Sequence, residues 1–182
     1  MARRNAALVF AVCLGLSAPA LTNALAGVQS EDAAPQFHFT NGEASIDSLI
    51  EKFRQALVDK DKNLLRSLRV TEDEYRNFIM PGSVDEGRPR AQYTEQASEY
   101  FWGILNGRSI YSEANLLHDF GGHEIKFTKV EYRKGVQKYR DYTAYKQLIL
   151  TVENENGEPE VMKIGSIAEV DGQFKFISFV RD

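Results

Sequence analysis

The chain has 182 residues, 26 acidic and 22 basic side chains, a net charge of −4 at pH 7 and one cysteine, Cys13. A single cysteine excludes an intramolecular disulfide and a cysteine-ligated metal centre. The acidic balance argues against nonspecific binding to nucleic acid or to an anionic membrane surface.

The N-terminus has the order of residues that marks a cleavable secretory signal. A positively charged start, Arg3-Arg4, precedes an uncharged run over residues 6–21, and Ala24 and Ala26 form an A-x-A cleavage pattern. The run is shorter than the ~20 residues that a membrane-spanning helix needs, so a retained anchor is the less favoured alternative. We expect cleavage after Ala26, with Ala20 as the less favoured site. We also expect export to the periplasm or the cell exterior, with no membrane association afterwards.

Removal of residues 1–26 leaves 156 residues, which is the size of one ordinary domain. Cys13 leaves with the signal, and 20 basic residues then face 26 acidic ones, for a net charge of −6. Residues 27–44 are mostly small and polar, which predicts a flexible lead-in. We expect a single domain over residues 45–182.

Helical patterns fill the first half of this domain. Apolar residues recur at helical spacing from residue 45 to about 61 with Ser45 available as N-cap, and a short helix is predicted at 63–68. A capping box begins a helix at Thr71, and Pro81-Gly82 ends it.

Two further helices are predicted after a loop. One covers residues 94–105 and ends at Asn106-Gly107, and the other covers about 112–118 and is closed by Gly121-Gly122.

Four strand patterns follow, over residues 123–132, 142–152, 161–170 and 174–180. Hairpin turns are predicted at 156–157 and 171–172, where Asn-Gly and Asp-Gly pairs tolerate the positive φ angles of such turns. The last strand is apolar on both faces, which predicts a central position in the sheet. Helices followed by antiparallel strands predict an α+β fold.

The helical half from Ser45 into Leu64-Leu65, together with residues 164–176 (IGSIAEVDGQFKF), resembles the NTF2-like superfamily, also called SnoaL-like or cystatin-like. The resemblance covers about residues 45–181. It implies N-terminal helices packed on one curved antiparallel sheet of about four strands, in a cone with a pocket inside. Such folds serve isomerases, dehydratases, cyclases and noncatalytic binding modules, so the resemblance selects no chemistry.

The densest group of chemically active side chains lies around the predicted start of the first strand. His118 and Asp119 could form an oriented base, and His118 with His123 could hold a metal, since imidazole serves both roles. The spacing matches no zinc signature, so ordinary polar residues at a helix end are favoured. The sequence predicts no metal site and no cofactor.

Two aromatic residues are candidate ligand contacts. Trp102 lies on a predicted helix, where core packing is the favoured alternative to a pocket wall. Tyr145 belongs to a segment of interleaved tyrosines and basic residues over 126–146, which would suit a polyanion or a glycan. The solvated face of two strands is the favoured alternative there.

Three functions remain open at this point. Noncatalytic binding of a small molecule or a protein partner ranks first, because no recognisable catalytic constellation accompanies the expected pocket. A small isomerase, dehydratase or cyclase using His118 or Asp119 ranks second. The third is an assembly role through sheet pairing in a homodimer, since NTF2-like domains commonly form dimers.

Overall fold

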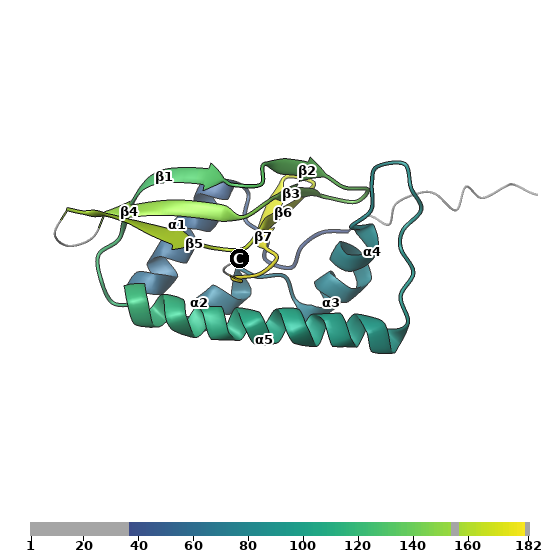
Figure 1. Ribbon diagram of the computed structural model, residues 1–182, viewed down its shortest axis with the longest axis horizontal. Coiled ribbons are helices and arrows are strands. Elements are labelled where there is room, and N and C mark those ends of the chain that lie inside the picture. The colour runs from purple at the N-terminus through teal and green to yellow at the C-terminus, as the bar shows by residue number, and fades with distance from the viewer. Residues whose placement is uncertain (1–36, 154–156, 181–182) are drawn as a thin grey trace, which may run out of the picture. The chain divides into compact units, whose positions relative to one another are not determined.

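The first half of the domain is helical and the second half is made of strands, so the fold is α+β as predicted (Figure 1). The computed structural model describes residues 37–153 and 157–180, which belong to the compact unit Ala34–Asp182. The predicted signal peptide lies outside the described residues.

The two predicted N-terminal helices are confirmed. Helix α1 (Ile46–Val58) begins where the Ser45 hydroxyl accepts a hydrogen bond from the Ser48 N–H at 3.0 Å, and it buries Leu49, Phe53 and Leu57. Helix α2 (Lys62–Ser67) is capped in the same way by the Asp61 carboxylate. The apolar stripe of α1 thereby enters the core beneath the sheets.

The predicted capping box is also confirmed, and it begins a composite helix. Helix α3 (Glu72–Glu74) continues as a π-helical turn, η1 (Tyr75–Ile79), and ends as α4 (Met80–Gly82). The Thr71 hydroxyl accepts from the Glu74 N–H at 3.2 Å, while the Glu74 carboxylate accepts from the Thr71 N–H at 2.7 Å.

The predicted break at Asn106-Gly107 is wrong, because one helix, α5 (Glu95–Phe120), runs through it. Glycine within a helix costs about 1 kcal/mol, which is too little to end a helix that is held along its length by packing. Buried contacts line the inner side of α5 on both sides of the glycine, at Ser98, Ser109 and Leu116.

The seven described strands form two antiparallel sheets, so the expectation of one curved sheet of about four strands is wrong. One sheet has the order β1-β4-β5 and the other has the order β2-β3-β6-β7. The first consists of β1 (Lys126–Tyr132), β4 (Leu148–Glu153) and β5 (Pro159–Lys163). The second consists of β2 (Val136–Lys138), β3 (Thr143–Tyr145), β6 (Ile167–Val170) and β7 (Gln173–Phe176).

Two predicted strands are each divided between the sheets. The strand expected at 142–152 breaks before β4, where Gln147 has φ 55°, and the strand expected at 161–170 breaks around Gly165. A Cβ at Gly165 would lie 2.3 Å from the Ser178 carbonyl oxygen, so only glycine lets the chain pass there. These breaks let consecutive segments leave one sheet and enter the other.

The last strand lies at a sheet edge rather than in the predicted central position. Its free side is covered by two isolated bridges, from Glu43 to Phe174 and from Arg69 to Phe176. The sequence predicts that Glu43 belongs to a flexible lead-in, but two backbone hydrogen bonds with Phe174 hold it on the edge of β7. The turn before this strand is confirmed, since Asp171 and Gly172 have φ angles of 48° and 75°.

Candidate functional site

A short connection between α2 and α3 carries the central residue of the site, Arg69. The Val70 N–H donates to the Phe176 carbonyl at 2.9 Å, and the Phe176 N–H donates to the Leu68 carbonyl at 2.9 Å. Leu68 and Val70 are buried on either side of Arg69, so this connection is fixed against the edge of β7.

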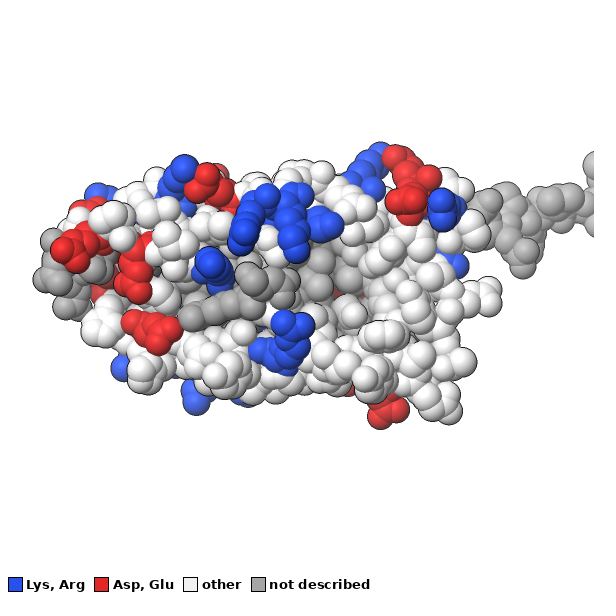
Figure 2. Space-filling model, viewed as in Figure 1, with Lys and Arg blue, Asp and Glu red and all other residues white. Residues whose placement is uncertain are grey.

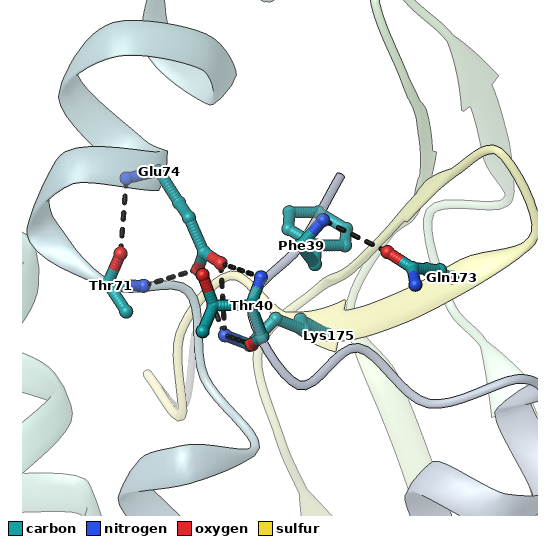
Figure 3. Close-up of polar contacts among 6 residues, drawn as sticks. All are labelled: Phe39, Thr40, Thr71, Glu74, Gln173 and Lys175. Carbon is teal, nitrogen blue, oxygen red and sulfur yellow. Dashed lines mark hydrogen bonds and ion pairs between the residues drawn. The ribbon is translucent and has the colours of Figure 1, made fainter. Parts of the chain in front are cut away.

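A buried polar network holds the far end of the same connection (Figure 3). The Glu74 carboxylate accepts from the Thr71 N–H and from the Thr40 N–H, both at 2.7 Å, and pairs with the Lys175 ammonium at 3.0 Å. The Lys175 ammonium also donates to the Thr40 carbonyl at 2.8 Å. The network therefore joins the N-terminal segment, α3 and β7 at one point.

Helix α5 supplies the opposite wall. Trp102, Asn106 and Ile110 are four residues apart along the helix, so they lie on one side of it, facing the α2–α3 connection. The Thr94 hydroxyl caps the start of α5 by accepting from the Ala97 N–H at 3.2 Å.

The Arg69 side chain occupies the space between these walls and is only 4% exposed. Its Nη2 donates to the Asn106 Oδ1 at 3.1 Å, and its guanidinium carbon lies 5.9 Å from the Trp102 ring centre and 5.7 Å from that of Phe179. The Nε of Arg69 is buried and makes no hydrogen bond to any residue in the described ranges.

The charge of Arg69 has no anionic partner within 4.0 Å in the described part of the chain. The buried carboxylate nearby, Glu113, forms its ion pair with Arg66 at 3.2 Å. Burial lowers the pKa of the Arg69 guanidinium, Glu113 opposes this shift, and the positive Arg66 adds to it. A guanidinium nevertheless stays charged at neutral pH, so a cation with an unused donor is held inside the protein.

A cleft of about 290 Å³ opens beside this cation. Its lining combines arginines with apolar side chains, namely Arg66, Arg69, Val70, Thr71, Trp102, Asn106 and Ile110. The volume is near the lower end of the range for small-molecule sites, about 300–1,000 Å³. This arrangement suits a small ligand with one anionic group and an apolar body.

The two aromatic candidates have different positions. Trp102 lines the cleft, whereas Tyr145 packs on Tyr132 and Phe174 with ring centres 5.2 and 6.2 Å away and lies outside this site. Sequence reasoning missed Arg69. The one feature of the sequence that could have indicated it is the position of Arg69 between two apolar residues, Leu68 and Val70. If those two side chains point into the core, an extended chain would direct Arg69 to the other side, towards solvent or a sheet edge.

The structure brings His118 and Asp119 together but not into the cleft. The His118 Nδ1 lies 3.0 Å from the Asp119 Oδ1, and the His118 side chain is 87% exposed near the end of α5. His123 is also exposed, in the turn before β1. Within residues 37–153 and 157–180, no group of three His, Cys, Asp or Glu side chains could hold a metal ion.

Comparison with protein-family models, with curated proteins and with solved structures finds no match to this chain. Among the described helices, none has both the length and the apolar character that a bilayer crossing requires.

Proposed function

We propose that the protein is an exported, noncatalytic binding module whose cleft takes a small molecule with one carboxylate and an apolar body. The observation that carries this proposal is the buried guanidinium of Arg69, which has an unused Nε donor and no carboxylate partner among the described residues. A buried charge without a partner is unfavourable, and a ligand carboxylate would supply that partner.

The geometry of arginine favours a carboxylate over a larger anion. Its planar fork matches the two oxygens of a carboxylate, and charge-assisted hydrogen bonds of this kind are the strong ones. Since Arg66 already pairs with Glu113, Arg69 is the remaining cation in the cleft lining, which suits a single negative charge. Trp102 and Ile110 would contact the apolar body.

The lining supports binding rather than catalysis. Its titratable side chains are two arginines, which cannot exchange protons near neutral pH, and the Thr71 hydroxyl already serves as a helix cap. The sequence prediction of export places such a ligand in the periplasm or outside the cell. The NTF2-like resemblance stays a prediction, and binding modules are among the members that it implies.

Isothermal titration calorimetry tests the proposal with matched pairs of probes, octanoate against octanol and phenylacetate against phenylethanol. We expect saturable binding of a carboxylate that is at least about tenfold tighter than that of its alcohol, because a hydrogen bond to a charged group contributes about 1.5–3 kcal/mol.

Two variants locate the binding. Arg69→Met should abolish the preference for the carboxylate, whereas Arg88→Gln, which alters a 72% exposed side chain outside the cleft, should leave binding unchanged. Equal affinity for acids and alcohols, or full binding by Arg69→Met, would show that Arg69 is not the anion site.

A further inference from the structure

The outward side of α5 is unusual for a helix at the surface, because its exposed side chains from Tyr100 to Tyr111 are largely apolar, with Arg108 as the exception. Tyr100, Ile104 and Tyr111 lie along this side and are 65%, 43% and 71% exposed, and Phe101 beside them is 45% exposed. A helix with one face on the core normally has polar residues on the other. Figure 2 accordingly shows little charge over the N-terminal half of α5.

Two glycines lie on the same outward side, Gly103 and Gly107. A Cβ added at either position would meet no atom within 4 Å, so no contact among the described residues requires glycine there. Each glycine costs the helix about 1 kcal/mol relative to alanine. Glycine does allow another backbone to approach closely, which these positions would need if a second helix packed on them.

We infer that this face of α5 docks on the same face of a second copy of the chain, with the two α5 helices antiparallel about a twofold axis. The axis passes midway between Ile104 and Gly107. In this register Ile104 of each copy faces Gly107 of the other, and Tyr100 faces Tyr111. A large side chain thus meets a small one at the centre, and aromatic rings meet at both ends.

The sequence of α5 is complementary to itself in this register, which is the reason for choosing a second copy as the occupant. An interface about a twofold axis must use one patch twice. Gly103 of each copy faces Arg108 of the other, so the two Arg108 side chains do not face each other in the interface. Ala97 faces Ala114, and the amides Gln96 and Asn115 face each other at the ends.

A surface hollow supports the same arrangement. It measures about 420 Å³ and lies beside Tyr111, with Arg108, Ser112 and Asn115 in its lining. In the proposed pair, Phe101 of the second copy lies level with Ile110 of the first copy, on the side of α5 that carries the hollow. The exposed Phe101 ring is therefore placed to enter the hollow.

The size of the face fits a reversible dimer. The 26 residues of α5 extend about 39 Å, and aromatic residues bury about 150–250 Å² each when fully covered. Three half-exposed aromatics and one isoleucine would contribute a few hundred Å² per copy, below the ~800 Å² of a standard interface. Trp102 and Asn106 lie on another side of α5, so the cleft at Arg69 stays open in the dimer.

Batch light scattering at increasing protein concentration, up to about 100 µM, should give a mean mass that rises from that of one chain towards that of two chains for the wild type. Ile104→Glu should give the mass of one chain, with an unchanged circular dichroism spectrum, because the side chain is exposed. Val161→Glu is the matched control, since Val161 is 55% exposed on the edge strand β5. A single-chain mass for the wild type at every concentration, or dimer loss in Val161→Glu and not in Ile104→Glu, would overturn the inference.

Cysteine crosslinking tests the register. In a Cys13→Ser background, Tyr100→Cys and Tyr111→Cys are prepared as separate proteins, mixed and oxidised. The antiparallel arrangement predicts a disulfide-linked heterodimer in the mixture and little crosslinking of either protein alone. Efficient crosslinking of Tyr100→Cys to itself would indicate parallel helices and contradict the arrangement.

Discussion

The Glu74 carboxylate and the Lys175 ammonium lie 3.0 Å apart, and their side chains are only 4% and 2% exposed. They join elements that are far apart in the sequence, α3 and β7. The two partners are not equally dependent on each other. Without Lys175, Glu74 would keep two backbone N–H donors, whereas without Glu74 the ammonium would keep one hydrogen-bond acceptor among the described residues, the Thr40 carbonyl, and the Phe39 ring 5.9 Å away.

We therefore expect Glu74→Met to lower the free energy of unfolding by about 3–5 kcal/mol, and Lys175→Met to lower it by less. The double variant should lose less than the sum of the two single losses, because it leaves neither charge unpaired. Urea unfolding of all four proteins measures this coupling. Strict additivity, or a larger loss for Lys175→Met, would contradict the asymmetry.

The buried phenol of Tyr142 predicts a loss of stability at alkaline pH. Burial raises the pKa of Tyr142, and its 2.7 Å hydrogen bond with the Ser83 hydroxyl opposes this only in part. Above pH 10 the unfolded chain releases the phenolic proton and the folded chain keeps it, so the unfolded state binds fewer protons and stability falls as pH rises. Melting temperatures recorded from pH 8 upwards should show this fall.

Tyr142→Phe should reduce the alkaline fall, at the expense of about 1 kcal/mol at neutral pH for the lost hydrogen bond. Tyr93→Phe, at a 46% exposed position, provides the comparison and should keep the wild-type pH dependence. If the two variants had the same alkaline slope, Tyr142 would not be its source.

The Arg69→Met variant shows whether Arg69 contributes to the stability of the ligand-free protein or only to ligand binding. Methionine fills a similar space without a charge, and replacing buried charges by apolar residues is often neutral or stabilising. We expect the unfolding free energy of the ligand-free variant to stay within about 1 kcal/mol of the wild type. A loss of several kcal/mol in thermal or urea unfolding would instead assign Arg69 a structural role through Asn106 and Trp102.

The order of residues at the N-terminus predicts the mature form of the protein. Mass spectrometry of material recovered from the periplasm or culture medium of an expressing bacterium should give a chain that begins at Gly27. Recovery of the same material with Met1 attached would contradict the predicted cleavage. Cleavage after Ala20 would move the site without affecting export.

Local chemistry explains which parts of the fold were predictable. The helix starts at Ser45, Thr71 and Thr94 were visible because each depends on a side chain and a backbone N–H only three residues away. The turn at Asp171-Gly172 was visible for another local reason, because these two residue types tolerate the positive φ angles of a tight turn. Such features need no information about the rest of the chain.

The errors arose where distant residues decide the structure. Helix α5 passes through Asn106-Gly107 because the core holds its inner side, and two strands divide between sheets at Gln147 and Gly165, where contacts from other segments determine the path. The site was only partly predictable for the same reason. Trp102 was a candidate, but Arg69 becomes significant only when α5 covers it.

Nuclear magnetic resonance of the arginine Nε–H groups during a ligand titration shows whether Arg69 receives a carboxylate. The Arg69 signal is assigned by its loss in Arg69→Met, and octanoate and phenylacetate are the probes. We expect one of these acids to shift the Arg69 signal saturably and its alcohol to leave the signal in place. If the signal stayed in place with both acids, or moved equally with the alcohols, Arg69 would not be the carboxylate site.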